Sequence, residues 1–166
     1  MIFFDLALLL KSLSAYKVNP IGIASISNAD SRTLNKSSHF GITHVGNVQE
    51  VEPILSACAD GEQQESGVAK MPYIFIANAT AGKPGAVASY EIWCDKIAQL
   101  GVLTKPEYRG QGLASSAAHA AAQNALSLSL IPQWRCRIGN SSSERLSQRL
   151  GFHKVGLQLA IDVVPK

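Results

Sequence analysis

The stretch TKPEYRGQGLASSAAHAAAQNALSLSLIPQWR, residues 104–135, decides the fold of this chain. It turns through Arg-Gly-Gln-Gly at 109–112 and then runs on as alanine, serine, leucine and glutamine, with no acidic or basic residue other than a histidine before Arg135. Alanine is the best helix former, and small side chains let another backbone come close. The composition therefore predicts a closely packed helix from Gly112 to about Leu128.

The residues before this helix predict a strand that ends at Thr104, because Pro106 cannot continue a hydrogen-bonded ladder. The first N–H groups of a helix have no partner within it, and the helix dipole adds partial positive charge there. Gly110 and Gly112 let the backbone bend and let a ligand approach. A strand, a glycine turn and a helix N-terminus form a cradle for phosphate, although the same turn can simply start a helix.

Two familiar phosphate-binding loops are excluded by the residues around the turn. A P-loop requires Gly-Lys-Ser/Thr, whereas Gly112 is followed by Leu-Ala-Ser, and the Gly-Lys-Pro-Gly at 82–85 falls in a predicted hairpin. A dinucleotide-binding turn requires a third glycine where this chain has Ser115, and an acidic residue near position 130 that is absent.

The flanking sequence predicts a mixed α/β sheet with helices on both faces. Strands are expected at 39–46, 73–79, 86–93, 97–104, 132–138 and 152–164, and helices at 48–59 and 141–150. The three strands from 73 to 104 form an antiparallel meander, in which residues 94–96 close a hairpin. Asn47 and Glu50 resemble a capping box, and Pro53 is expected to kink or shorten the helix at 48–59. Asn140 or a following serine is expected to cap the helix at 141–150. The polar stretch 61–72 is expected to end in a turn.

Residues 1–38 are interpreted as an N-terminal extension of a domain that covers residues 39–166. The opening MIFFDLALLLKSLSAY predicts a packed helix rather than a secretion signal or a membrane span, because no basic residue precedes its short apolar run. Residues 17–38 predict only a short strand and a loop.

Composition limits the classes of function. The 166 residues suit one domain, 46% of them are apolar, and a net charge of +3 is too small for nucleic acid to be the main partner.

Basic residues gather in the last third, either as a solvated face or as a site for an anionic ligand; they are Arg135, Arg137, Arg145, Arg149, His153 and Lys154. Cys58, Cys94 and Cys136 are too widely spaced for a zinc site, and we expect reduced, buried thiols, no metal, no membrane partner and a cytoplasmic location.

In its glycine turn and in the segment at 137–152, the sequence resembles the GNAT superfamily of acyl-CoA-dependent N-acyltransferases. Residues 109–114, Arg-Gly-Gln-Gly-Leu-Ala, fit the family pattern Arg/Gln-x-x-Gly-x-Gly/Ala between a strand and a helix. A second segment, RIGNSSSERLSQRLGF at 137–152, is similar to the family's Asn-x-x-Ser/Ala element followed by Leu-Gly-Phe. The resemblance covers residues 73–160 well and implies a GNAT-like fold, mostly antiparallel, with a splayed central pair of strands.

The resemblance also implies roles for individual residues, with acetyl-CoA as co-substrate. Backbone amides from Gly110 to Ser115 would hold the pyrophosphate, the strand before the turn would pair with the pantetheine arm, and a backbone amide near Val102 or Leu103 would polarise the acyl carbonyl. The residues implied to contact CoA are Val102, Leu103, Thr104, Arg109, Gly110, Gln111, Gly112, Leu113, Ala114, Ser115, Asn140 and Ser143.

The catalytic residues are less clear, because the usual ones are missing. Many family members carry a glutamate on the strand after the long helix and a tyrosine in the following helix, where this chain has no acid and Ser147 respectively. Glu91 is the best candidate base and Ser147 the residue at the acid position, although Glu91 also fits a solvent-facing strand carboxylate. Trp93 and Trp134 fit either an acceptor pocket or the core.

The leading hypothesis is an N-acetyltransferase that acts on a small-molecule or peptide amine by direct transfer in a ternary complex, possible as a homodimer. A CoA-binding module of the same fold without turnover is the main alternative. An unrelated α/β domain in which the glycine turn binds nothing is the third.

Overall fold

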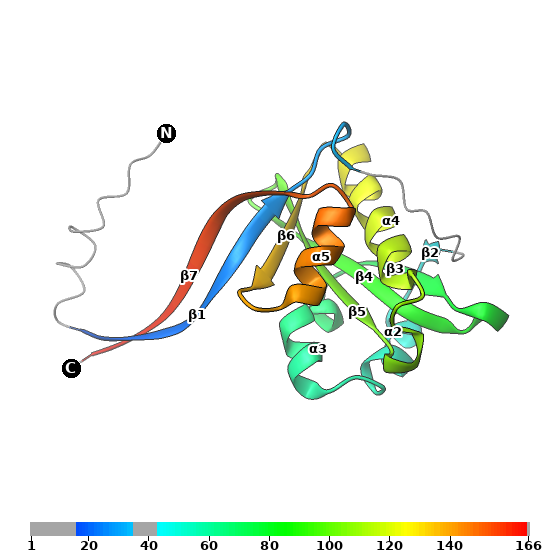
Figure 1. Cartoon of the computed structure of the whole chain (residues 1–166), viewed down its shortest axis with the longest axis horizontal. Helices are drawn as coiled ribbons and strands as arrows, with labels where there is room; N and C mark the ends of the chain where they lie inside the picture. The colour runs from blue at the N-terminus through cyan, green and yellow to red at the C-terminus, as the bar shows by residue number, and fades with distance from the viewer. Residues whose placement is uncertain (1–15, 35–42, 166) are drawn as a thin grey trace.

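A seven-stranded sheet with the order β2-β3-β4-β5-β6-β1-β7 forms the centre of the protein. The computed structural model describes residues 16–34 and 43–165 (Figure 1). The strands are β1 (Tyr16–Asn28), β2 (Thr43–Val45), β3 (Tyr73–Asn78), β4 (Pro84–Trp93), β5 (Ile97–Thr104), β6 (Ile131–Arg137) and β7 (His153–Pro165). The helices are α2 (Val48–Leu55), α3 (Asp60–Ser66), α4 (Leu113–Ser127) and α5 (Ser141–Arg149), with 3-10 turns η1 (Val68–Lys70), η2 (Thr80–Gly82) and η3 (Pro106–Tyr108).

Strand alternation builds two cores, one on each face of the sheet. Phe75 and Ala77 of β3 belong to the larger core beneath α4 and α5, whereas Ile74 and Ile76 belong to the smaller core beneath α2 and η1. Both faces of the sheet are therefore covered by helices, as the sequence predicted (Figure 1).

Helix α4 lies against the centre of the sheet because its inner face consists of small residues. Five alanines of this helix are completely buried; they are Ala117, Ala118, Ala121, Ala122 and Ala125. They meet Ala86 and Ala88 of β4 in the larger core, so that backbone approaches backbone. The hydroxyl of Tyr90 on β4 donates a hydrogen bond to Asn124 Oδ1 on α4.

The central strands β5 and β6 are the only parallel pair among the described strands, and they separate after a short contact. Their paired residues run from Ile97 opposite Ile131 to Leu100 opposite Trp134. Beyond that point β5 continues to Thr104 in pairing with β4, and β6 continues to Arg137 in pairing with β1. This separation is the predicted splay.

The cap predictions for two helices are confirmed. Asn47 and Glu50 form a reciprocal capping box at the start of α2, and the helix ends at Leu55, two residues after Pro53. The side chain of Asn140 caps α5 by accepting a hydrogen bond from the amide of Ser143.

Two segments differ from their sequence predictions. Residues 16–28, expected to give only a short strand, form the long strand β1, which pairs with both β6 and β7. The polar residues 60–70, expected to end in a turn, form α3 and η1. The helix predicted for the first residues of the chain lies outside the described residues.

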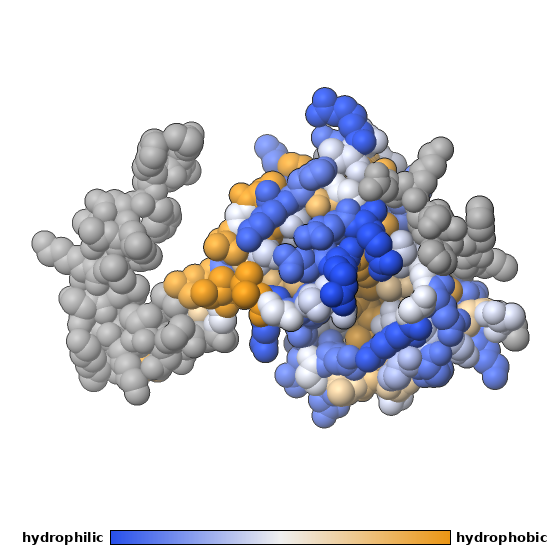
Figure 2. Space-filling model, viewed as in Figure 1, coloured by the Kyte–Doolittle hydropathy of each residue, from blue (hydrophilic) through white to orange (hydrophobic). Residues whose placement is uncertain are grey.

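Strands β1 and β7 extend from the body as a two-stranded ribbon (Figure 1). Apolar side chains are exposed along this ribbon, which Figure 2 shows as an orange surface where it meets the body; they include Ile23, Val155, Leu157 and Leu159. Strand β7 forms one edge of the sheet.

No helix within residues 16–34 and 43–165 is long and apolar enough to span a bilayer. In the same residues, no three His, Cys, Asp or Glu side chains are grouped to hold a metal ion. Cys58 and Cys136 are buried, but Cys94 is exposed because it lies in the β4–β5 hairpin turn with a positive φ of 51°. The expectation that the three thiols are all buried is therefore wrong for Cys94.

Candidate functional site: a cleft between β5 and β6

A cleft of about 1100 Å³ opens where β5 and β6 separate. One side of it is formed by the glycine turn, the start of α4, and α5. The other side is formed by α3, η1 and the ends of β4 and β6 that carry Glu91 and Arg135. The cleft therefore connects a helix N-terminus to a carboxylate on the far side of the sheet.

The glycine turn leaves the start of α4 open. Gly110 and Gly112 have φ angles of 78° and 81°, a left-handed backbone that favours glycine. Gly112 is the N-cap residue and no side chain caps the helix, so the first helical hydrogen bond is the one from Ser116 N–H to the Gly112 carbonyl. A Cβ at Gly110 would meet no atom within 4 Å. Amides at the start of α4 thus face space that an anionic group can fill.

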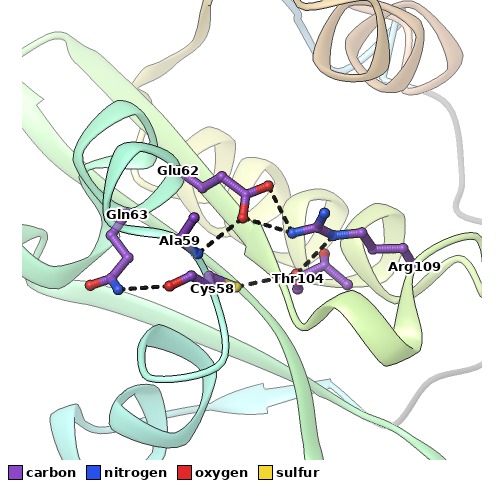
Figure 3. A network of polar contacts seen from close by, with 6 residues as sticks. All are labelled: Cys58, Ala59, Glu62, Gln63, Thr104 and Arg109. Carbon is purple, nitrogen blue, oxygen red and sulfur yellow. Dashed lines mark hydrogen bonds and ion pairs between the residues drawn. The ribbon is translucent and has the colours of Figure 1, made fainter.

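A polar network ties the glycine turn to α3 (Figure 3). One guanidinium nitrogen of Arg109 bonds both carboxylate oxygens of Glu62, at 2.8 and 2.9 Å, and Arg109 Nε donates to the Thr104 carbonyl. Glu62 raises the pKa of Arg109. The thiol of Cys58 donates to the same Thr104 carbonyl, and burial raises the pKa of this thiol. The network holds the end of β5, the turn and α3 in one arrangement.

Gly101 on β5 determines how closely α3 approaches the cleft. A Cβ at this position would lie 2.0 Å from the carbonyl oxygen of Ser66, the last residue of α3. Glycine therefore allows the end of α3 to pack directly on the strand, which brings Glu65 within 3.1 Å of the side-chain nitrogen of Asn140 across the cleft.

Side chains of β6 and α5 also line the cleft. Trp134 is 4% exposed and packs edge-on against Phe152, with ring centroids 5.4 Å apart. Its indole N–H donates to the hydroxyl of Ser143 at 2.9 Å. Asn140 and Ser143 thus border the cleft while fixing the start of α5 and the Trp134 ring.

On the far side of the sheet, Glu91 of β4 stands directly opposite Gln99 of β5. Gln99 in turn stands opposite Gln133 of β6. Arg135, two residues further along β6, lies 5.0 Å above the Trp93 ring and donates to Gln158 at 3.3 Å. Glu91, Gln99 and Arg135 all line the cleft.

The structure brings most of the residues singled out from the sequence together. All predicted CoA-contacting residues except Gln111 line the cleft, and so does Glu91. The Gln111 amide instead donates to the Glu107 carbonyl. Ser147 lies on the buried side of α5, away from the cleft lining, and its hydroxyl donates to the Glu144 carbonyl at 2.9 Å.

The sequence reasoning missed Gln99, Glu62 and Glu65. The signal for Gln99 was present, because a hairpin closed at 94–96 pairs residue 91 with residue 99 on one face of the sheet. No comparable signal marked the two glutamates, since they depend on how α3 packs against β5.

Comparisons with known proteins were consistent with this geometry. A family model described as GNAT acetyltransferase matches residues 81–157. No curated protein matches the sequence. Among solved structures, a GCN5-related N-acetyltransferase from Kribbella flavida has a TM-score of 0.70 at 19% identity, with 96% of this chain and 63% of that chain covered.

Two further structures share the fold. An acetyltransferase from the GNAT family of Colwellia psychrerythraea gives a TM-score of 0.65 at 14% identity, with coverage of 98% of this chain and 62% of that chain. A functionally unknown conserved protein from Staphylococcus epidermidis gives 0.64 at 14% identity, with coverage of 99% and 69%. The chain thus spans 62–69% of the length of these three structures. Residues 81–157 thus match the GNAT acetyltransferase family model, and the chain shares its fold with solved structures of GNAT acetyltransferases.

Proposed function

We propose that this protein transfers an acetyl group from acetyl-CoA to a primary amine, by direct attack within a ternary complex. The observation that supports it most is the cleft itself, which runs from the uncapped N-terminus of α4, between separated strands, to Glu91. A thioester placed along β5 could meet an amine that enters from the side of α3.

The residues on the α4 side suit a phosphorylated cofactor. The amides at the start of α4 and the open space before Gly110 accept a pyrophosphate, and Arg145 and Arg149 also line this part of the cleft. The edge of β5 from Gly101 to Thr104 lies in the cleft with no partner from β6, so it can pair with an extended arm. When bound, acetyl-CoA supplies an activated acyl group.

Glu91 is the proposed base. An alkyl ammonium has a pKa near 10, so the amine must lose a proton before its nitrogen can attack. The nitrogen forms a C–N bond as the C–S bond breaks, the proton leaves for the Glu91 carboxylate directly or through water, and the thiolate takes up a proton on release. In this proposal a backbone amide of Val102 or Leu103, both of which line the cleft, stabilises the developing oxyanion.

No side chain is proposed as the acid. The hydroxyl of Ser147 is committed to a helix carbonyl outside the cleft lining. Proton delivery to the thiolate by water is sufficient, since holding both reactants in one cleft contributes several kcal/mol by itself.

Thiol release from acetyl-CoA with a panel of primary amines, together with calorimetric titration of CoA, tests this function. Saturable thiol release that depends on an amine is the expected result. CoA binding without release on any amine would instead favour a CoA-binding module without turnover, an alternative suggested by the position of Ser147 outside the cleft. Absence of CoA binding would contradict both.

A further inference from the structure

A buried side-chain oxygen without a partner belongs to Gln99, a residue that lines the cleft. Gln99 is 2% exposed, its Nε2 donates to the Leu100 carbonyl at 3.2 Å, and its Oε1 has no hydrogen-bond partner. The amide orientation follows from that bond, because only the nitrogen can donate to a carbonyl. Within the described residues one other buried side-chain atom, Asn78 Oδ1, lacks a partner, and Asn78 does not line the cleft.

An unpaired buried acceptor destabilises a fold, so its occurrence on a residue that lines a cleft points to a ligand that supplies a donor. The residue directly opposite Gln99 is Glu91, whose carboxylate is also an acceptor. Side chains paired in this way lie about 5 Å apart on the same face of the sheet. Gln99 Oε1 and the Glu91 carboxylate are adjacent acceptors, and they suit one ligand group with several N–H donors. An amine is such a group.

Arg135 is a basic group on this face of the sheet that also lines the cleft. It follows Gln133 by two residues on β6 and therefore points to the same side as Gln99. Its guanidinium rests on the Trp93 ring and donates to the neutral Gln158, and no carboxylate of the described residues forms an ion pair with it. Five N–H donors and a full positive charge thus remain largely available to an anion.

We propose that this half of the cleft binds an aminocarboxylate as the acetyl acceptor. The amine donates to Gln99 Oε1 and Glu91, and the carboxylate pairs with Arg135 above Trp93. This inference rests on the proposed transferase and adds the chemical class of its acceptor. A simple uncharged amine would leave the guanidinium unused, and a donor-free ligand would leave Gln99 Oε1 unpaired.

The test compares matched acceptors, for example β-alanine with β-alaninamide and phenylalanine with phenylalaninamide, in the thiol-release assay. Conversion of the carboxylate to the amide lowers the pKa of the amine and so increases its neutral, reactive fraction. A higher kcat/KM for the aminocarboxylate would therefore underestimate the contribution of the carboxylate to binding. The expected kcat/KM is at least tenfold higher for the aminocarboxylate of at least one pair.

Variants separate the two contacts. Arg135→Met should raise KM for the aminocarboxylate at least tenfold and leave KM for its amide and for acetyl-CoA within twofold. Arg137→Met is the matched control, because Arg137 is exposed on the same face of β6 but does not line the cleft, and it should change neither value. Gln99→Leu should raise KM for both acceptors without lowering the melting temperature, since it removes the unpaired oxygen.

The outcomes are distinct. Equal kcat/KM for every pair, or a preference that survives Arg135→Met, overturns the acceptor assignment while the transferase stands. A fall in melting temperature of Gln99→Leu with unchanged KM shows that Gln99 is structural only, which also overturns it. Failure of every amine to release thiol overturns the transferase and the acceptor together.

Discussion

Gly112 occupies a position where the backbone, and in the proposed complex also the ligand, requires the absence of a side chain. Its φ of 81° is unfavourable for other residues, and it lies in the cleft at the start of α4. We expect Gly112→Val to lower CoA affinity at least tenfold, because a branched side chain would stand in the path of the phosphates. Calorimetric titration of CoA measures this change.

A matched control separates ligand contact from backbone strain. Gly82 also has a left-handed φ, 74°, with open space around it, but lies outside the cleft lining. Gly82→Val should cost comparable stability and leave CoA affinity unchanged. Equal CoA affinity of Gly112→Val and the unchanged protein would contradict the phosphate site.

Glu91 carries the proposed proton transfer. Glu91→Gln keeps the size of the side chain and removes the carboxylate, so we expect a lower kcat at neutral pH and an altered pH profile with little change in the KM for acetyl-CoA. Steady-state thiol release between pH 6 and 9.5 measures both. An unaltered profile would remove Glu91 as the base.

At the residue level the sequence predicted the glycine turn and the two caps because these depend on neighbours within a few positions. Asn47 with Glu50, and Asn140 with Ser143, are local pairs. The contact of Glu62 with Arg109 joins residues 47 positions apart, and only the packing of α3 brings them together.

Among the elements, α4 is tied to the sheet by a partly buried hydrogen bond between Tyr90 and Asn124. Burial, with a smaller effect of Tyr73, raises the pKa of Tyr90 from 10 to about 12. The folded state therefore keeps a proton that the unfolded chain loses, so this stability is complete below pH 10 and is lost as the pH rises from 10 to 12.

Tyr90→Phe tests this link. It should lower the free energy of unfolding by about 1 kcal/mol at neutral pH, the value of one hydrogen bond. It should also flatten the fall in stability between pH 10 and 12. Urea unfolding monitored at a series of pH values measures both, with Tyr73→Phe as the control that keeps the hydrogen bond. A fall that is equally steep in Tyr90→Phe would show that other groups cause it.

The elements that sequence predicted well are those with a strong local period. The meander of β3, β4 and β5 alternates clearly, and α4 is rich in alanine. Strand β1 was underestimated because Pro20 and Gly22 are poor strand residues, and its length comes from pairing with β7 and β6. Helix α3 has no buried residue and therefore no apolar period to detect.

For the molecule as a whole, the three thiols report on folding. Cys94 is exposed in a turn, whereas burial raises the pKa of both Cys58 and Cys136. We expect iodoacetamide to modify Cys94 quickly and the two buried thiols only when the fold opens, since thiolate is the reactive form. Peptide mass spectrometry over a time course identifies each site, and Cys94→Ser should remove the fast phase. Rapid modification of Cys58 in the folded protein would contradict the packing of α3 on β5.

The arrangement of the whole sheet fits the proposal that one cleft binds both acetyl-CoA and its acceptor. Helices on both faces leave the gap between β5 and β6 as a passage, with the α4 N-terminus on one side and Glu91, Gln99 and Arg135 on the other. The sequence predicted the side at the α4 N-terminus through a motif. The side with Glu91, Gln99 and Arg135 is assembled from separate strands, so it could be recognised only from the register of those strands in the structure.

The central claim is that CoA lies along β5 with its diphosphate at the start of α4. Titration of CoA into isotope-labelled protein, followed by amide NMR, tests it most directly. We predict saturable shifts at the amides of Gly110–Ser115 and Val102–Thr104, with little change along the β1–β7 ribbon. Undisturbed resonances at both segments under a saturating concentration of CoA would contradict it.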